Sequence, residues 1–437
     1  MKLMLLYRRR WLLIYLPILL ALAGALGMVT RLWHPLPPPR LVIGTGPAQS
    51  SYLRLAQLYA SRLEHHGIAV DLVTHPRPQD ALQHMASVDG PIDATFAQGL
   101  YAPANASSTA VGGVQALAVI GHEIVWVFAR KDIADMAHLR GRRIATSVVG
   151  SSNRIAADLL LAHLRIRPDE VEFVPEVGDS ALAALTEGRV DAVIHVATGD
   201  SQTANALARL DGVHILGMER AGALAARERR LWPVVMPQGS IELRSQLPTS
   251  DLPTMVTLTH LLARPGLHPA LQRALLDVAG ELHVMSGFLE SPGRYPTTVG
   301  SDFPVSPVAL QHARGERPWM ETLLPFGTAQ KAELFLYAVL PLGLLGVVLL
   351  LRAPRYIDWR VDAALQHIYG EVHFMEEDLA RQTTAKPVAL QPLLDRLDIL
   401  ERRVEQMQLP NRYAGRGYTL RQHLYQTRQR LIEMHAT

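Results

Sequence analysis

The sequence predicts an α/β protein with two lobes, joined to two transmembrane helices and a helical C-terminal tail. Two segments in different parts of the chain each have the pattern of a strand, a small polar loop and a helix. Two long apolar runs carry arginines at one flank. The segment from residue 353 onward is rich in Arg, Gln, Glu and Leu and has helical periodicity. These observations place the α/β part between the two apolar runs.

The two strand–loop–helix segments have the same order of features. The first spans residues 40–63, with its polar loop at 44–51, and the second spans residues 143–164, with its loop at 149–154. A helix N-terminus leaves backbone N–H groups without partners, and the helix dipole favours an anion there. The repetition predicts two lobes that each present a helix N-terminus to a shared cleft. An ordinary N-cap loop is the alternative for each segment alone.

Strands and short helices alternate through this region. Strands are expected at residues 40–43, 69–73, 92–97, 143–146, 171–174 and 191–196, and helices at 52–63, 80–87, 155–164 and 180–186. Two further strands, 115–120 and 124–129, are expected to cross between the lobes. Such alternation is typical of mainly parallel sheets, which bind ligands at the carboxyl ends of their strands. The loop Gly44-Thr45-Gly46 lacks the further residues of a dinucleotide fingerprint or a P-loop.

Length and composition limit the class of protein. The chain has 437 residues, a formal net charge of +3 and no cysteine. Its length predicts two or three domains of about 150 residues each. The small net charge gives no indication of nucleic-acid binding. The absence of cysteine excludes disulfides, thiolate catalysis and Cys-ligated metal sites, and it suits an oxidising compartment.

Two apolar runs are long enough to cross a bilayer. The first, Trp11–Val29, follows three arginines, and the second, Leu334–Leu351, precedes Arg352 and further arginines. A transmembrane helix needs about 20 residues, and cytoplasmic flanks are rich in Lys and Arg. Both flanks therefore predict cytoplasmic termini, with the region between the runs outside. A cleaved signal peptide and a buried helix are the alternatives for the first and the second run.

The expected domains follow from these elements. They are a cytoplasmic N-terminus (1–10), a transmembrane helix (11–30), a Pro-rich linker (31–40), a two-lobed domain (41–330, with the second lobe at about 130–230), a second transmembrane helix (334–351) and a cytoplasmic helical tail (353–437). The prolines of the linker favour a stiff, extended spacer between the membrane and the two-lobed domain.

The tail contains an apolar stripe that needs a partner. Leucines recur at spacings of three and four from Leu390 to Leu400, and Val404 and Met407 extend the stripe. Leu420, Leu424 and Leu431 of the next segment are the expected partners. We favour an intramolecular helical hairpin, and a helix that binds a partner or mediates self-association is the alternative.

Short motifs between residues 43 and 326 follow one another in a recognisable order. They are Ile43-Gly44-Thr45-Gly46, Asp93-Ala94-Thr95-Phe96-Ala97-Gln98, Leu139-Arg140-Gly141-Arg142-Arg143-Ile144-Ala145, Gly150-Ser151-Ser152-Asn153, Glu187-Gly188-Arg189-Val190-Asp191-Ala192-Val193, Leu267-His268-Pro269-Ala270-Leu271, Ser291-Pro292-Gly293-Arg294-Tyr295-Pro296 and Leu324-Pro325-Phe326. With these motifs, residues 41–330 resemble the TAXI family of TRAP-transporter solute-binding proteins. The last motifs and the tail resemble a membrane-anchored branch of that family.

The resemblance implies a periplasmic-binding-protein-like fold of type II, with a small organic anion of the carboxylate type in the cleft between the lobes. It also implies membrane permease subunits as partners, with the protein in the bacterial inner membrane and its main domain in the periplasm. The chain departs from the family in the first loop, where Pro47 replaces the usual glycines and removes an N–H donor.

The candidate ligand-binding residues lie at strand ends and helix starts within the matching motifs. They are Thr45, Gly46, Ser51, Tyr52, Gln98, Ser151, Ser152, Asn153, Arg154 and Thr198. Their hydroxyl, amide and guanidinium groups are suited to hold a carboxylate.

Enzymatic function is not expected. The histidines lack a ligand pair at i,i+4 spacing, and His122-Glu123 lacks the second histidine of a zinc-protease helix. Asp93 and Asp191 lie at strand starts, where structural roles are expected. We therefore expect no catalytic residue, metal or cofactor. Two alternatives to a transport-associated binding protein are a transmembrane sensor and a structural or assembly protein that has lost its ligand.

Overall fold

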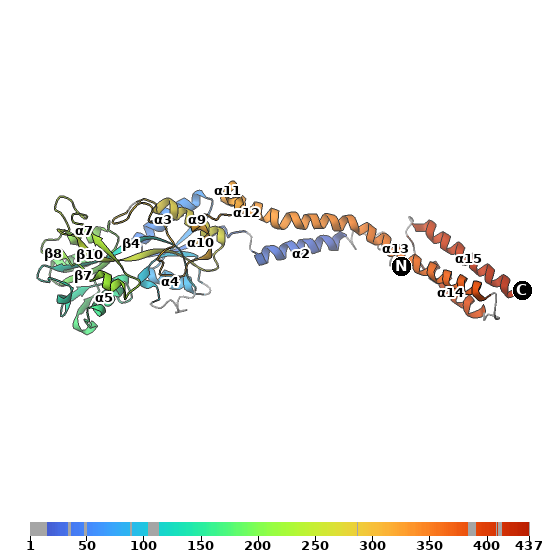
Figure 1. The fold of residues 1–437 in the computed structure, drawn as a ribbon, viewed down its shortest axis with the longest axis horizontal. Helices are drawn as coiled ribbons and strands as arrows, with labels where there is room; N and C mark the ends of the chain where they lie inside the picture. Colours follow the sequence, from blue (N-terminus) through green and yellow to red (C-terminus); the bar gives the residue numbers. More distant parts are fainter. Residues whose placement is uncertain are drawn as a thin grey trace. The chain divides into compact units, whose positions relative to one another are not determined.

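The computed structural model describes residues 15–33, 36–47, 50–87, 90–103, 113–285, 287–382, 390–407, 409 and 413–436. The chain divides into two compact units (Figure 1). One unit is Pro37–Gln330, and the other comprises the described residues of the segments 1–36 and 331–437. Each unit has an apolar core of its own.

A ten-stranded mixed sheet organises the unit Pro37–Gln330. Its strands are β1 (Arg40–Thr45), β2 (Ala69–Thr74), β3 (Ala94–Gln98), β4 (Gln115–Arg130), β5 (Arg143–Ala145), β6 (Glu172–Val174), β7 (Ala192–Ala197), β8 (Val213–Ile215), β9 (Trp232–Met236) and β10 (Leu252–Ala263). Neighbouring strands follow the order β2-β1-β3-β10-β4-β7-β5-β6, with β8 beside β4 and β9 beside β10. The fold is therefore α/β, as the alternating pattern predicts, but the sheet is mixed rather than mainly parallel, because the long strands β4 and β10 pair antiparallel with all of their neighbours.

Two parallel parts of the sheet repeat one connection, and they define the two lobes. In lobe one, β1-α3-β2-α4-β3 gives the order β2-β1-β3, and in lobe two β5-α5-β6-α6-β7 gives the order β6-β5-β7. The helices are α3 (Ser51–His65), α4 (Pro78–Ala86), α5 (Ser152–His163) and α6 (Asp179–Thr186). The strand–loop–helix segment expected twice from the sequence is thus present once in each lobe.

Two long antiparallel strands join the lobes. β4 pairs with β10 along most of its length and with β7 from Ile124 to Ala129. The segments 115–120 and 124–129, expected as separate strands, form one strand because the residues between them stay paired with β10. The pairing shifts register between Thr259 and His260 and again between Leu261 and Leu262. Strand β10 was not expected, and the second lobe extends past residue 230 to include β9 and the first half of β10.

Each lobe has apolar cores on its side of the crossing strands. In lobe one, α9 (Pro269–His283) packs with α3 over a core that contains Tyr59, Phe96 and Leu275. In lobe two the core includes Ile144, Leu160 and Ile194. The shorter helices of this unit are η2 (Gly99–Tyr101), η4 (Met136–Leu139), η5 (Pro168–Glu170), α7 (Gln202–Ala208), α8 (Ala221–Ala225), α10 (Pro307–Ala313) and α11 (Trp319–Leu323).

The apolar helices belong to the second unit, except that the first residues of α12 lie in the unit Pro37–Gln330. They are α2 (Leu16–Trp33), α12 (Phe326–Leu334), the π-helical turn η6 (Phe335–Val339) and α13 (Leu340–Gln382). Among the described residues, the continuous helical stretch Phe326–Glu377 is long and apolar enough to cross a membrane, whereas Leu16–Leu32 is apolar but shorter. The beginning of the first apolar run, including Trp11, lies outside the described residues. The structure therefore offers one candidate span, and the predicted pair of spans stays a prediction.

The tail forms three packed helices. The C-terminal part of α13 packs with α14 (Leu390–Glu405) and α15 (Ala414–Ala436). The predicted stripe packs against its expected partners, with Leu397, Leu400 and Val404 in one core with Leu420, Leu424 and Leu431. The core also contains residues of α13, among them Val361 and Leu365. The stripe is therefore covered by other helices of the same chain, as predicted, and α13 joins the two expected helices in this packing.

Candidate functional site

A buried carboxylate lies where β4 crosses from one lobe to the other. Glu123 Oε1 accepts hydrogen bonds from Tyr52 Oη at 2.6 Å and from Thr259 Oγ1 at 3.4 Å. Glu123 Oε2 accepts a short hydrogen bond from Gln98 Nε2. We call Glu123, Tyr52, Gln98 and Thr259 the Glu123 cluster. Two of its members, Tyr52 and Gln98, are residues that the sequence predicted to bind ligand.

Local structure explains how these side chains meet. Ser50 is the N-cap of α3, and its side chain accepts from the Leu53 N–H at 3.2 Å, which fixes the first turn that carries Tyr52. Gln98 is the last residue of β3, so its side chain lies at a carboxyl strand end. Thr259 lies on β10, directly opposite Gly121 and diagonal to Glu123. Three elements of lobe one thus converge on the crossing strand.

Burial controls the protonation of the cluster. Glu123 is 5% exposed, and burial raises its pKa, although hydrogen bonds from Tyr52, Gln98 and Thr259 oppose the rise. Burial, followed by the charge of Glu123, holds the pKa of Tyr52 well above its usual value. A carboxyl group with a raised pKa that faces only neutral donors is typical of a functional site, although structural networks also produce it.

Lobe two contacts the same region through η2. Burial raises the pKa of Tyr101 to about 12, and hydrogen bonds from Ser152, at the start of α5, oppose this rise. The charge of Glu123 contributes to the same rise in the pKa of Tyr101, and η2 packs against α5. Next to Tyr101, Leu100 is buried in the core of lobe two, and its carbonyl accepts from Arg230 Nη1 at 3.4 Å. The lobes therefore meet between the end of β3 and the start of α5.

The other predicted residues of lobe two are held within that lobe. Ser151 is the N-cap of α5, and its side chain accepts from the Arg154 N–H at 3.3 Å. Asn153 Oδ1 accepts from the Val196 N–H at 2.9 Å, which ties α5 to β7. Arg154 Nε donates to Asp158 Oδ1 at 2.9 Å, and its guanidinium lies 3.5 Å from the centre of the Phe173 ring. The Ser151 hydroxyl, the Asn153 amide and the Arg154 guanidinium, which were predicted to hold an anion, therefore already have partners within lobe two.

The remaining candidates lie at the strand ends. Thr45 and Gly46 are buried at the carboxyl end of β1, where Thr45 Oγ1 donates to the Gly46 carbonyl at 3.2 Å. Ser51 is exposed in the first turn of α3. Thr198 follows β7 and is half-buried, and its carbonyl accepts from the Ser201 N–H at 3.1 Å. The structure thus brings Tyr52 and Gln98 together around Glu123 and joins them to Ser152 through Tyr101.

Sequence reasoning missed Glu123, Thr259 and Tyr101. Glu123 was considered only as part of a zinc motif, yet it is the single acid of the strand Gln115–Arg130, which is apolar on both sides of the pair His122-Glu123. An isolated charge in a buried strand is the signal that could have identified it.

The opposite face of the crossing carries a second polar group. The carboxylate of Glu290 lies 3.2 Å from His122 Nδ1 and accepts from the His122 N–H at 3.3 Å. Burial lowers the pKa of His122 to about 4 and raises that of Glu290. The hydroxyl of Tyr295 is 3.4 Å from the same ring nitrogen. His122 and Glu123 alternate on one strand, so their side chains serve opposite faces of the sheet.

A third buried acid covers the start of η2. The Asp302 N–H donates to His260 Nε2 at 3.1 Å, so this histidine carries its proton on Nδ1 and is neutral. Burial lowers the pKa of His260 to about 4 and raises that of Asp302 to about 7. A Cβ on Gly99 would collide with the Asp302 carboxylate, which explains the glycine there.

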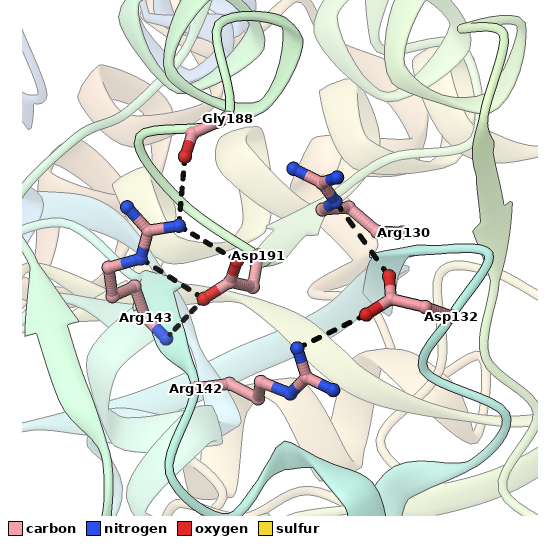
Figure 2. Close-up of polar contacts among 6 residues, drawn as sticks. All are labelled: Arg130, Asp132, Arg142, Arg143, Gly188 and Asp191. Atoms are coloured by element: carbon pink, nitrogen blue, oxygen red, sulfur yellow. Dashed lines mark hydrogen bonds and ion pairs between the residues drawn. The ribbon is translucent and has the colours of Figure 1, made fainter.

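The two acids at strand starts have structural partners, as the sequence predicts. Figure 2 shows Arg143 donating from its backbone N–H and side chain to Asp191, with Nη2 also bound to the Gly188 carbonyl at 2.8 Å. Beside it, Asp132 pairs with Arg142 at 3.1 Å (Figure 2).

The same arrangement occurs in lobe one. Asp93 accepts from the Val42 N–H at 2.8 Å and from Arg264 Nε at 2.7 Å. These carboxylates therefore join β3 to β1 and β7 to β5.

Two surface hollows lie away from the Glu123 cluster. One, of about 300 Å³, is lined by α5 and the segment after it, including Asp158 and Phe173. The other, of about 220 Å³, lies beside α9 and α11, where Arg273 and Glu321 form a two-pronged ion pair at 2.6 and 2.7 Å. Neither is lined by a residue that was predicted to bind ligand.

Comparisons with known proteins give one local family match. The family described as NMT1/THI5 like matches residues 63–220, which is less than half of the chain. No curated protein matches the chain.

Several solved structures are similar at low identity. A protein from Bordetella bronchiseptica RB50 is 19% identical, with 64% of this chain and 91% of that chain covered and a TM-score of 0.37. The periplasmic aliphatic sulphonate binding protein SsuA from Escherichia coli is 14% identical, with 69% and 83% covered and a TM-score of 0.37. The periplasmic sulfonate-binding protein SsuA of a sulfonate ABC transporter from Methylobacillus flagellatus KT is 17% identical, with 55% and 67% covered and a TM-score of 0.36.

Proposed function

We propose that residues 37–330 form a solute-binding domain that takes a small organic acid between its two lobes. The observation that carries this proposal is the repeated β-α-β-α-β connection, of which the lobe-one helix start and strand end meet around the Glu123 cluster at the β4–β10 crossing, with α5 of lobe two packed against the adjoining η2. The NMT1/THI5-like match to residues 63–220 supports a domain of this class. The strand order β2-β1-β3-β10-β4 supports the type II form of the periplasmic-binding-protein fold.

We further propose that the domain serves a TRAP-type transport system of the TAXI kind and is tethered to the bacterial inner membrane by two spans. The arginines beside each apolar run support an N-terminus and a tail in the cytoplasm, with the domain in the periplasm. A reporter fused after Thr437 is then expected to be cytoplasmic, and one inserted near Gly239 extracytoplasmic. Finding both reporters in one compartment would contradict the two-span topology.

The binding proposal is tested at the start of α5. The change of both Ser151 and Ser152 to Ala is expected to weaken binding of a responsive carboxylate by about 1–3 kcal/mol if their hydroxyls bind the acid group at the start of α5. Because Ser151 also caps α5, the melting temperature of the double variant is measured with its affinity. Titration calorimetry on the purified full chain measures the effect. Ser180→Ala, at the start of α6 in the same lobe, is the matched control. Unchanged affinity in the double variant would count against this site.

A sensor is the second candidate, and one observation favours it. Helix α13 runs without a break from the candidate span into the three-helix tail. Such an element is able to carry a displacement between compartments. If ligand binding changes cross-linking within the tail while deletion of a neighbouring permease leaves the phenotype unchanged, the sensor is the better description. A chain that responds to no solute in either assay fits the third possibility, a structural or assembly protein.

A further inference from the structure

The Glu123 carboxylate is buried without a cation. Its three partners are a phenol, an amide and a hydroxyl, and among the described residues no ion pair includes it. An ionised carboxylate out of water is costly unless a counter-charge accompanies it. Asp93 and Asp191, the buried acids at the strand starts, each have an arginine, so this chain supplies counter-charges where the role is structural.

The position of Glu123 connects it to both walls of the proposed site. Tyr52 and Gln98 belong to the helix start and the strand end of lobe one. Tyr101 lies on η2, which follows Gln98 directly and packs against α5, the helix that Ser152 begins in lobe two. Because Glu123 is buried, a solute would reach it only after the lobes part, and the packing of η2 against α5 is one place where the lobes meet.

The carboxylate has capacity for a further donor. Two carboxylate oxygens offer about four lone-pair positions. Tyr52 and Gln98 take one position each, and the Thr259 hydroxyl is distant at 3.4 Å. An ammonium group can therefore bind without displacing either of the two close partners, and its charge would compensate that of Glu123. An acid without an amine would instead meet a like charge in a buried site.

We propose that Glu123 is the counter-ion for a protonated amine on the solute, so that the site selects amine-bearing organic acids over amine-free acids of the same shape. The inference rests on the proposed solute-binding function and narrows its ligand class. The solute's acid group would lie toward the start of α5 and its amine toward the β4–β10 crossing.

Matched pairs of small acids test the proposal. Aspartate and succinate differ by one amine, and so do taurine and ethanesulfonate. The full chain in lipid nanodiscs is titrated with all four compounds by calorimetry, as wild type and as Glu123→Gln. We expect the wild type to prefer the amine-bearing member of the pair that binds by about a hundredfold, and Glu123→Gln to lose this preference.

Controls separate charge from fold. Glu316→Gln removes an equal charge from an exposed side chain and is expected to keep the wild-type preference. Glu123→Asp keeps the charge but retracts it, so it is expected to keep a reduced preference, and it serves if Glu123→Gln does not fold. Circular dichroism and the melting temperature verify each variant.

Three outcomes decide the matter. Equal affinity for both members of a pair in the wild type overturns the inference and leaves the solute-binding function in place. A preference that persists in Glu123→Gln also overturns it, and assigns Glu123 a structural role between the lobes. The absence of binding by all four acids in every variant counts against the solute-binding function, and against the inference with it.

Discussion

Lobe one and lobe two begin with the same strand–loop–helix structure, but the first turns of the two helices contact different parts of the molecule. In each lobe a serine caps the first helix: Ser50 accepts from Leu53 and Ser151 accepts from Arg154. Two residues after the cap, Tyr52 extends to the carboxylate on the crossing strand, whereas Asn153 binds the backbone of its own lobe. The side chain at this shared position therefore determines whether the helix start contacts the crossing strand β4 or is bound within its own lobe.

The comparison extends to the strand starts. Asp93 and Asp191 each accept a backbone N–H from the neighbouring strand and each bind an arginine. Both carboxylates are mostly buried, so the two lobes share this support although their arginines come from different elements. The scaffold is thus repeated, and the differences are concentrated at the helix starts and at the crossing.

The largest expected effect comes from removal of the shared support. Asp93→Ala and Asp191→Ala are each expected to lower the free energy of unfolding by about 2–4 kcal/mol, because an arginine and a backbone N–H lose their partner. Chemical denaturation of the full chain in detergent measures both. Asp169→Ala, an exposed surface change, is the control. A loss in only one lobe would show that the two carboxylates are not equivalent.

Substitutions two residues after each N-cap, at Tyr52 and Asn153, test the different roles of the two helix starts. Asn153→Ala is expected to cost about 1–3 kcal/mol of stability, because the buried Val196 N–H loses its acceptor. Tyr52→Phe is expected to cost less stability, because Gln98 still donates to Glu123, but to change solute affinity more. Thermal melts and calorimetry on the same samples separate the two effects. The reverse ranking would contradict the division of roles between the lobes.

A pH series tests the acid that covers η2. Asp302 has a folded-state pKa of about 7, above its unfolded value, so its contribution to stability is present below about pH 4 and is lost as the pH rises through 7. His260, with a pKa lowered to about 4, contributes stability that is present above about pH 6.5 and is lost as the pH falls through 4.

Above about pH 6.5 the contribution of His260 no longer varies, whereas that of Asp302 still changes up to about pH 7. Asp302→Asn is expected to be more stable than the wild type at pH 8 by about 1–2 kcal/mol, and the difference is expected to shrink toward pH 6.5, the lower end of this window. Melting temperatures across this window give the answer. A difference that does not vary with pH would show that the ionisation of Asp302 is not involved.

The smallest expected effect concerns the caps themselves. Ser50→Ala and Ser151→Ala are each expected to cost about 1 kcal/mol, the usual value of a helix N-cap. The two costs are expected to agree within about 0.5 kcal/mol if the local structures are equivalent. Urea denaturation of the full chain measures both, and a clear inequality would break the local equivalence of the lobes.

Local patterns predicted the repeated part of the fold. The strand, loop and helix of each lobe follow from apolar periodicity and from small polar residues, which act over a few positions. The structure places these elements within a few residues of their expected bounds, for example α3 at Ser51–His65 and β7 at Ala192–Ala197. The tail stripe was predictable for the same reason, because leucines three and four residues apart share one helix face.

Nonlocal pairing explains what the sequence did not show. Strand β10 is defined by partners far away in the chain, and its pattern of threonines and apolar residues is buried along almost its whole length, so it lacks the alternation of a half-exposed strand. Glu123 has partners 71 and 136 residues away, and no spacing rule connects them. A functional role for Glu123 could be inferred only from the structure, because only the crossing of β4 between the lobes places this acid among three neutral donors.

The continuity of α13 restricts the kind of motion that could pass along it. A helix of 43 residues is about 65 Å long, and it resists stretching because each residue is held at a rise of about 1.5 Å. Tilting, sliding and rotation about the helix axis are therefore the available motions. Successive residues of an α-helix are rotated by about 100° about its axis. Insertion of one residue between the candidate span and the tail bundle would turn the bundle by that angle, whereas insertion of seven residues would restore its facing nearly completely. The number of residues in α13 between the candidate span and the tail bundle thus sets the rotation of the bundle about the helix axis.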